Sequence, residues 1–293
     1  MIRLALRVQS ERAELVLAEL LELAGGGVEE LELADGRVEY AIYGAEGELP
    51  ALPDLEATAK GALCEISTST IRNDWHERWR AFHRPTLIRG EGAGLGRGRS
   101  LYIRPPWMER GEGEGVDEIV IDPGQAFGTG SHATTKLSLK MLLDLHQQIT
   151  ALEGERAAQR RVLDFGTGSG ILAIAAAKLR FHPVIGLDFD RESIAAASLN
   201  AARNCVSLEL READLLTEPL PPLDGAIVLA NLLRPTLRAI ASRMTTPPRE
   251  LLLSGVLVEE ADEVSSAFSG HLPLLERARS VEGEWAGIWL TMC

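Results

Sequence analysis

Long apolar runs and cysteines are scarce in this chain of 293 residues. It contains no stretch of about 18 uninterrupted apolar residues, the length that a membrane-spanning helix needs. Its three cysteines, Cys64, Cys205 and Cys293, lie far apart and lack the spacing of a disulfide framework or a zinc site. These absences disfavour a membrane protein, a disulfide-stabilised secreted protein and a zinc protein. We therefore expect a cytoplasmic location, free thiols and no bound metal.

Basic residues are also few. The sequence has 30 Lys and Arg against 43 Asp and Glu, which gives a formal net charge of −13. A protein that binds nucleic-acid phosphates needs a basic face, and only Arg97 and Arg99, in a glycine-rich segment, resemble one. Direct nucleic-acid binding is therefore not expected. The acidic balance could steer a lysine-rich protein partner toward the molecule, or it could serve solubility alone.

Length and composition indicate two folded domains, since 293 residues exceed one average domain and the 45% hydrophobic content is typical of globular proteins. The first 72 residues show the order βαββαβ, which is typical of a ferredoxin-like fold. The predicted strands are 2–8, 28–33, 37–43 and 65–70, and the predicted helices are 11–23 and 52–63. This domain carries no chemically distinctive residues, so it is either a docking module or a structural appendage.

Residues 73–110 are predicted to link this domain to a larger one at 111–293. Trp75 and Trp79 are spaced to lie on one side of a short helix, where they would anchor the segment. The glycine-rich stretch 90–98 predicts a flexible surface loop. Movement of the two domains relative to each other is expected at this linker.

The most informative segment is a βαβ unit at residues 162–190. An apolar strand runs into Gly166, Gly168 and Gly170, which open a helix, and a second apolar strand ends at Asp188. Glycines permit the tight turn and let a ligand lie against bare backbone. An acid 22 residues after Gly166 can accept hydrogen bonds from both ribose hydroxyls of a nucleoside. The unit therefore predicts a site for an adenosine-like ligand.

Positions 164 and 171 separate the two cofactor classes that use such a unit. The dinucleotide fingerprint G-x-G-x-x-G requires glycine at 171, where this chain has Ile171. Asp164 precedes the first glycine, and a carboxylate there would repel a pyrophosphate but attract an ammonium group, directly or through water. These residues favour S-adenosylmethionine (AdoMet) over a dinucleotide, and a methyltransferase over a dehydrogenase. A glycine turn needed only for packing would leave Asp188 unexplained.

A second polar segment, residues 122–142, precedes this unit. Its polar side chains include Thr129, Ser131, His132, Thr134 and Thr135, and an apolar pattern of helical spacing follows. Hydroxyl groups at this place could cap the helix and could point donors into the ligand site, and the alternative is that they are caps alone.

Several motifs follow one another in a specific order between residues 73 and 293. They are DWHERW, LYIRPPW, DPGQAFGTGSHATT, VLDFGTGSGILAIAAAKL, IGLDFDRESIAAASLNAARN, IVLANLLRPTL, LLLSGVL and GEWAGIWL. Together they resemble the bacterial ribosomal protein L11 methyltransferase family (PrmA). The resemblance implies an AdoMet-dependent enzyme that methylates lysine and N-terminal amines of that ribosomal protein. It also implies a seven-stranded, Rossmann-like α/β domain preceded by a ferredoxin-like α+β domain that recognises the protein substrate.

The resemblance also implies site residues, by position in its motifs. AdoMet contacts fall on Thr135, Gly166, Asp188 and Asn231, with Phe127 in the same wall. The full set of predicted cofactor-binding residues is Phe127, Thr135, Asp164, Gly166, Gly168, Gly170, Asp188 and Asn231. Asn231 is also the candidate catalytic residue, because its amide oxygen or its backbone carbonyl could accept a hydrogen bond from the substrate amine. It could equally contact only the cofactor or cap a helix.

The substrate and the acid–base chemistry stay open at this point. The family pattern is broken at Arg234, where a small residue is common, and at Pro247-Pro248, where a glycine often stands. No Ser-His-Asp or paired-carboxylate device is evident, so a dry pocket or water is expected to remove the amine's proton. Two rival functions are a lysine methyltransferase that acts on another protein and a non-catalytic AdoMet-binding module.

Overall fold

The computed structural model divides the chain into two compact units, Met1–Phe82 and His83–Cys293, which are described separately. It describes residues 2–13, 16–17, 20, 28–33, 36–44, 49, 63–70, 84–90, 99–109, 116–122, 130, 132–154 and 159–293.

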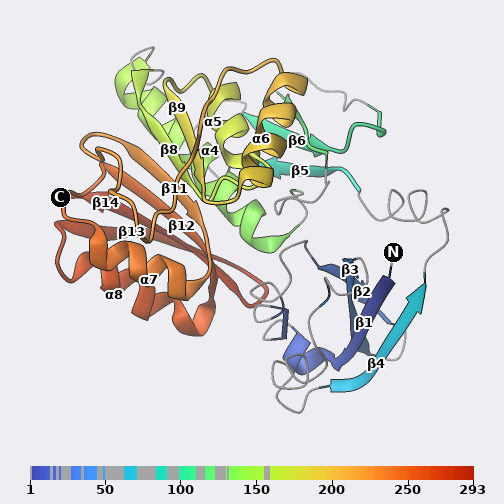
Figure 1. Ribbon diagram of the computed structural model, residues 1–293. Coiled ribbons are helices and arrows are strands. Elements are labelled where there is room, and N and C mark those ends of the chain that lie inside the picture. The colour runs from blue at the N-terminus through green and yellow to red at the C-terminus, as the bar shows by residue number, and fades with distance from the viewer. Residues whose placement is uncertain are drawn as a thin grey trace. The chain divides into compact units, whose positions relative to one another are not determined.

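The first unit contains a four-stranded antiparallel sheet in the order β2-β3-β1-β4 (Figure 1). Its strands are β1 (Ile2–Gln9), β2 (Glu29–Glu32), β3 (Arg37–Gly44) and β4 (Leu63–Thr70), and a 3-10 turn, η1 (Ser10–Arg12), follows β1. One face of the sheet is apolar because hydrophobic residues alternate along β1 and β3. This face packs with described positions of the predicted helix 11–23, and the core comprises Leu4, Leu6, Val8, Ala13, Val16, Leu17, Leu20, Val38, Tyr40 and Ile42. The predicted helix 52–63 lies outside the described residues, so the ferredoxin-like assignment stays a prediction.

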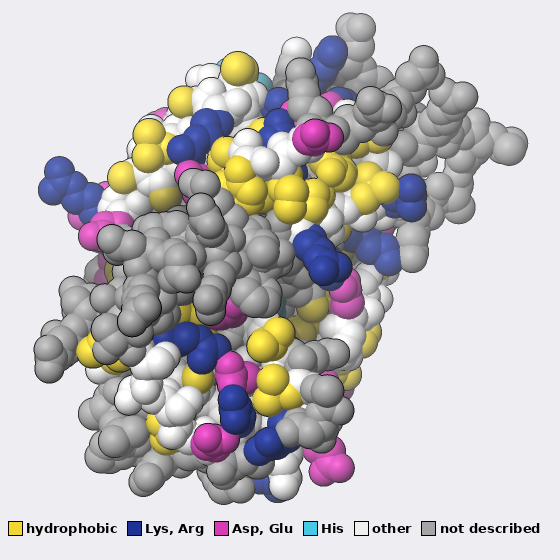
Figure 2. Space-filling view, turned by 90° about the vertical axis from the view of Figure 1, so that its right-hand side faces the viewer, with side chains coloured by type: hydrophobic (Ala, Val, Ile, Leu, Met, Phe, Trp, Pro, Cys, Tyr) yellow, Lys and Arg dark blue, Asp and Glu magenta, His cyan; other side chains and the backbone are white. Residues whose placement is uncertain are grey.

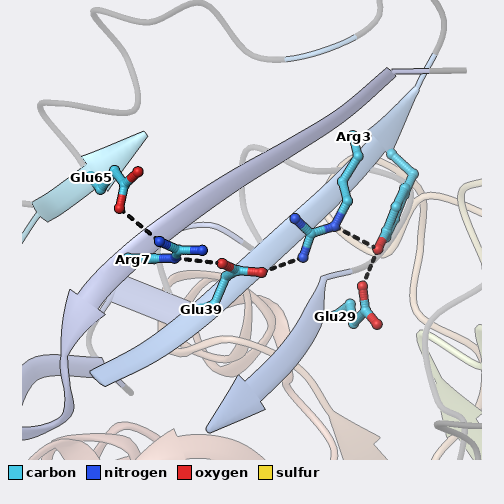
Figure 3. Close-up of polar contacts among 6 residues, drawn as sticks. Arg3, Arg7, Glu29, Glu39 and Glu65 are labelled. Atoms are coloured by element: carbon cyan, nitrogen blue, oxygen red, sulfur yellow. Dashed lines mark hydrogen bonds and ion pairs between the residues drawn. The ribbon is translucent and has the colours of Figure 1, made fainter. Parts of the chain in front are cut away.

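The other face of this sheet carries a network of ion pairs (Figure 3). Glu39 of β3 binds Arg3 and Arg7 of β1, with its Oε2 2.7 Å from Arg7 Nε. Arg7 continues to Glu65 of β4 at 2.8 Å. Burial alone would raise the pKa of Glu39, but the hydrogen bonds from Arg3 and Arg7 outweigh it and hold that pKa below its ordinary value. The buried charge is therefore compensated within the sheet itself.

The second unit is built on a seven-stranded sheet in the order β10-β9-β8-β11-β12-β14-β13 (Figure 1). Its strands are β8 (Val162–Phe165), β9 (Val184–Asp188), β10 (Glu209–Glu212), β11 (Ile227–Asn231), β12 (Glu250–Leu257), β13 (Leu274–Glu282) and β14 (Trp285–Met292). Neighbouring strands from β10 to β12 are parallel, whereas β14 runs antiparallel to both β12 and β13. The helices are α4 (Ala133–Glu153), α5 (Ile171–Lys178), α6 (Arg191–Arg203), α7 (Arg234–Arg243) and α8 (Ala261–Ser269), with a 3-10 turn, η3 (Val258–Glu260), before α8.

The central strands read as continuous apolar runs because helices cover both faces of the sheet. Val162 and Leu229 point into the core that contains α4 and α5, whereas Leu163 and Val228 point into the core that contains α7 and α8. The prediction of an α/β fold with one large sheet is therefore confirmed. None of the described helices, including the longest one, α4, combines the length and apolarity needed to cross a membrane.

Part of the predicted linker is folded into the second unit, which corrects that prediction. Strands β5 (Thr86–Arg89) and β6 (Ser100–Arg104) pair antiparallel, and β6 pairs parallel with β7 (Val116–Val120). Ile88, Leu101 and Ile103 alternate with more exposed residues, and they are buried in the same core as α4 and α5. The tryptophans of the predicted anchor and most of the glycine-rich stretch lie outside the described residues.

Candidate functional site

The candidate site lies at the carboxyl ends of β8, β9 and β11. Strand β9 lies on one side of β8, and β11, which comes later in the chain, lies on the other side. The order of strands therefore reverses between β8 and β11. In open α/β sheets such a switch point is where ligands bind. Gly166 follows β8, Asp188 ends β9 and Asn231 ends β11. Three of the predicted residues are therefore brought to one edge of the sheet.

The glycine loop after β8 requires its glycines for backbone reasons. Gly166, Gly168 and Gly170 have φ values of 69°, 52° and 82°, a region that residues with a Cβ atom reach only at a cost. A Cβ atom on Gly166 would also lie 2.4 Å from Cδ2 of Leu232, and one on Gly170 would lie 3.0 Å from Cβ of Ala197 in α6. The loop thus needs bare backbone where it meets α6 and the segment after β11.

Asp188 is held in place by the loop that it faces. Its Oδ2 accepts a hydrogen bond of 2.9 Å from the backbone N–H of Gly168, and its Oδ1 accepts one of 3.1 Å from that of Asp190. Burial raises the pKa of Asp188 above its ordinary value, and the nearby Asp190 adds to this, although the backbone hydrogen bonds oppose it. Each carboxylate oxygen keeps further acceptor capacity for a ligand hydroxyl.

Asp164, in the middle of β8, has one oxygen that is satisfied and one that is not. Its Oδ2 accepts from the hydroxyl of Thr167 at 2.7 Å and from the N–H of Ala173, in the first turn of α5, at 3.1 Å. No described residue donates to its buried Oδ1. Burial raises the pKa of Asp164 to about 7. Asp164 therefore braces the glycine loop, a role that the motif alone did not predict, and keeps an acceptor for a donor from outside the chain.

The start of α4 supplies the second wall. Thr135 is fully buried, and Asn231 Nδ2 donates to its hydroxyl over a long 3.4 Å. The cap of α4 is the side chain of His132, whose Nδ1 accepts from the N–H of Thr134 at 3.4 Å and lies 2.8 Å from the Thr134 hydroxyl. The hydroxyl of Thr135 thus points toward Asn231, while an imidazole performs the capping that the sequence assigned to hydroxyls.

The imidazole of His132 is uncharged at neutral pH. Burial is the main reason why its pKa falls to about 4, and the positive charge of Lys136 acts in the same direction. The ring also makes an edge contact with Trp285 of β14 at 5.2 Å between centroids. A neutral ring is required for this cap, because Nδ1 must keep a lone pair to accept from the backbone.

Asn200 of α6 is a site residue that sequence reasoning missed. It is 1% exposed, its Nδ2 donates to the carbonyl of Ser169 at 2.9 Å, and its Oδ1 accepts from the N–H of Asp122 at 3.0 Å. Asn200 therefore joins the glycine loop to Asp122, which lies just after the end of β7. The available signal was a polar residue on the buried face of an alanine-rich helix, where an apolar side chain is expected.

Arg234, the departure at the start of α7, is turned toward α8. Its guanidinium lies 3.3 Å from Glu260 and 3.5 Å from Glu263. The cation is thus paired on the surface and does not need a ligand charge. Phe127 lies outside the described residues, and within the described part of the chain no group of three or more His, Cys, Asp or Glu could hold a metal ion.

The donor set fits a nucleoside that carries a cationic amino-acid tail. The loop offers bare backbone, Asp188 beside it keeps acceptor capacity on a carboxylate bonded to the loop, and Asp164 offers a buried acceptor to which no described residue donates. A pyrophosphate would instead meet two carboxylates, which is unfavourable. The site can therefore hold AdoMet better than a dinucleotide.

Comparison with known proteins identifies the family of the chain. Residues 4–292 match the family model described as ribosomal protein L11 methyltransferase (PrmA). The chain is 40% identical over 227 residues to the ribosomal protein L11 methyltransferase of Geobacter metallireducens, which covers 75% of this chain and 67% of that protein. It is 32% identical over 311 residues to the protein of the same name from Aliivibrio salmonicida, with 98% and 97% covered. A crystal structure of ribosomal protein L11 methylase from Lactobacillus delbrueckii is similar with a TM-score of 0.54 and 28% identity, over 70% of this chain and 98% of that one.

Proposed function

The chain belongs to the ribosomal protein L11 methyltransferase family, and from this premise we propose that it is an enzyme that transfers methyl groups from AdoMet to lysine and N-terminal amines of ribosomal protein L11. The observation that carries the proposal is the meeting of the glycine loop, Asp188 and Asn231 at the switch point of the sheet, beside an oxygen of Asp164 that accepts from no described residue.

The cofactor would be held by the chain's own groups at this edge. The backbone of Gly166, Gly168 and Gly170 would leave room for the nucleoside, and Asp188 would accept from the ribose hydroxyls. Asp164 Oδ1, to which no described residue donates, would accept from the ammonium group of the cofactor, directly or through water. We assign Thr135 and Phe127 to the wall around the methionine tail. When bound, AdoMet supplies a methyl group activated by its sulfonium.

The transfer itself requires placement rather than a covalent enzyme intermediate. Asn231 would face the substrate nitrogen and accept a hydrogen bond from it. This bond would orient the lone pair of the nitrogen toward the methyl group. Such positioning is worth effective molarities of about 10⁵ to 10⁸ M in well-oriented systems. The amine must be neutral to react, and a dry pocket favours its neutral form. Among the described residues, the side chains that contact Asn231 are Thr135 and Ser254, and neither is a base. We therefore assign the proton of the substrate ammonium group to water.

We assign substrate recognition to the first unit, and we propose a ferredoxin-like fold for it. The sheet order β2-β3-β1-β4 and the buried helical positions after β1 support that fold. The described residues of this unit form a hydrophobic core of their own, and the glycine loop, Asp164, Asp188 and Asn231 all belong to the second unit. A docking role would explain why the enzyme retains it.

We also propose a protein partner in the cytoplasm without direct binding to nucleic acid. The net charge of −13 supports this, as does the surface in Figure 2, where acidic and basic side chains are intermixed among the described residues that face the viewer. The free ribosomal protein is the substrate in this scheme.

The test is incubation with radiolabelled AdoMet and either purified L11 or a ribosome-free protein extract. We expect label on L11, at lysine side chains and at the N-terminal amine. Label on a different protein alone would identify a lysine methyltransferase with another substrate. Binding of AdoMet without label on any protein would identify a non-catalytic binding module, and both outcomes would contradict the proposal.

A further inference from the structure

Strand β12 is irregular beside the candidate site. Its pairing register with β14 shifts between Leu253 and Val256, so Ser254 and Gly255 form a bulge. Ser254 also pairs in register with Asn231 of β11. Bulges often redirect the chain next to active sites, and this one adjoins the residue proposed to face the substrate amine.

Gly255 admits the backbone that follows Asn231. Its φ is +83°, and a Cβ atom there would lie 2.6 Å from the carbonyl oxygen of Leu232 and 2.9 Å from its carbonyl carbon. These are backbone atoms, so they cannot turn aside as a side chain can. The N–H of Leu232 donates to the carbonyl of Ser254 at 3.1 Å. The bulge therefore fixes the position of the residue next to Asn231.

Ser254 joins the same segment to the start of α4. Its side chain is fully buried, and its hydroxyl donates to the carbonyl of Thr134 at 2.7 Å. The same oxygen lies 3.4 Å from Oδ1 of Asn231, whose Nδ2 reaches Thr135. The single hydrogen of the Ser254 hydroxyl goes to Thr134, so Ser254 holds the start of α4, and the Thr135 hydroxyl there accepts from Asn231 Nδ2 and limits how that amide can turn.

The effect of the bulge extends to the glycine loop through Leu232. The side chain of Leu232 covers Gly166 so closely that a Cβ atom there would lie 2.4 Å from Leu232 Cδ2. A displaced Leu232 backbone would therefore move a side chain that lies against the loop. One bulge contacts both the proposed catalytic side and the proposed cofactor side of the site.

We propose that Ser254 and Gly255 are positioning residues for methyl transfer: Ser254 sets the amide of Asn231, and Gly255 sets Leu232 against the glycine loop. This inference rests on the proposed function. It assigns neither residue a contact with substrate or cofactor.

The test for Ser254 compares Ser254→Ala with Ser138→Ala. Ser138 is also buried, at 2% exposed, and no described residue bonds its hydroxyl, so it controls for loss of a buried hydroxyl. We expect Ser254→Ala to lower kcat about tenfold with a KM for L11 within about twofold of the wild type, and Ser138→Ala to change neither. In an Asn231→Ala background, Ser254→Ala should cause no further loss, because its effect passes through that side chain.

A nuclear magnetic resonance measurement separates this inference from the proposed function. The side-chain amide signals of Asn231, assigned by their loss in Asn231→Asp, should shift in Ser254→Ala and stay in place in Ser138→Ala. If wild-type enzyme fails to methylate L11, the proposed function fails while these signals still report the positioning. Unchanged Asn231 signals, or an equal loss of kcat in the Asn231→Ala background, would overturn the role of Ser254.

Gly255→Ala has its own matched control in Gly283→Ala. Gly283 also has a positive φ, of +61°, but a Cβ atom there would meet nothing within 4 Å. Both variants place an alanine at a positive φ, but only Gly255→Ala also meets backbone atoms, so only it should weaken AdoMet binding in a calorimetric titration, by about tenfold or more. Equal affinities of the two variants would overturn the role of Gly255, and a thermal melt of both verifies that they are folded.

Discussion

Glu39 in the first unit and Asp164 in the second are both buried carboxylates, and the protein treats them in opposite ways. Glu39 is 5% exposed and receives hydrogen bonds from two arginines, so its pKa lies below the ordinary value. Asp164 is 1% exposed, receives hydrogen bonds from Thr167 and Ala173 alone among the described residues, and has a pKa raised by burial to about 7. Among the described residues, no ion pair involves Asp164 or Asp188.

The difference separates a carboxylate that stabilises a fold from one that is available to a ligand. A buried charge is costly unless it is paired, so a chain that only needed to fold would compensate Asp164 as it compensates Glu39. The second unit leaves that acceptor open at the edge of the sheet where Asp188 also lies. The same cost that disfavours the free state favours binding of a cationic group.

The largest expected effect is that of Asp188→Ala on cofactor affinity. Two ribose hydroxyls lose a charged acceptor, which should cost about 3 kcal/mol and weaken AdoMet binding about 100-fold. Isothermal titration calorimetry measures this, with Glu39→Gln as the comparison variant. Unchanged affinity in Asp188→Ala would contradict the ribose assignment.

Next in size is the effect of Glu39→Gln on the stability of the first unit. The change leaves Arg3 and Arg7 without their shared counter-charge, and since both arginines are partly exposed we expect a loss of about 2 kcal/mol. Hydrogen exchange of the β1 and β3 amides reports this loss, and AdoMet affinity should stay within about twofold. The more exposed Glu65→Gln is the control and should change exchange much less. A drop in AdoMet affinity with Glu39→Gln would erase the contrast between the two carboxylates.

The two carboxylates should also give opposite pH dependences of stability. The folded pKa of Glu39 is below its unfolded value near 4.5, so its contribution is present above that pH and is lost as the pH falls through the folded pKa. The folded pKa of Asp164, about 7, is above its unfolded value near 3.8, so its contribution is present at low pH and is lost as the pH rises from about 3.8 to 7.

Asp164→Asn tests the second of these slopes. The substitution removes the titrating group, so the decline in stability of the second unit between pH 4 and 7 should become shallower in urea denaturation. It should also weaken AdoMet binding about tenfold at pH 8, because the carboxylate charge that pairs with the ammonium group is gone. An unaltered slope together with wild-type affinity would mean that Asp164 only braces the glycine loop.

The smallest effect is expected at an exposed ion pair of the second unit. Lys136 of α4 lies 3.3 Å from Glu282 of β13, and both side chains are only partly buried. Glu282→Gln should therefore change the free energy of unfolding by less than about 0.5 kcal/mol. A thermal melt gives this value, and a loss as large as that of Glu39→Gln would show that burial does not govern the contrast drawn above.

The sequence predicted the parts of the site that are local along the chain. The strand, glycine loop, helix and acid of residues 162–190 lie within one βαβ unit, so their spacing sufficed to place Gly166 and Asp188 at one edge. The resemblance to the L11 methyltransferase family is confirmed by the family match. Thr135 and Asn231 lie far apart in the sequence and were assigned to one site only through that resemblance. In the structure, Asn231 Nδ2 lies 3.4 Å from the hydroxyl oxygen of Thr135.

Contacts between distant segments could not be predicted in the same way. Asn200 forms hydrogen bonds with Asp122 and Ser169, and Ser254 forms one with Thr134. These contacts depend on how the sheet and the helices assemble. Strand β6 was missed because neither of its pairings leaves a short hairpin signal: its antiparallel partner β5 is separated from it by the glycine-rich stretch, and β7 pairs with it in parallel. The cap by His132 was missed because imidazole is not among the preferred capping side chains.

The most direct test of the whole account is a crystal structure of this chain grown with S-adenosylhomocysteine. The account predicts the nucleoside along Gly166, Gly168 and Gly170, its ribose hydroxyls on the carboxylate of Asp188, and its amino group on Oδ1 of Asp164, directly or through one water. A nucleoside bound elsewhere, with Asp188 still bonded only to backbone N–H groups, would contradict it.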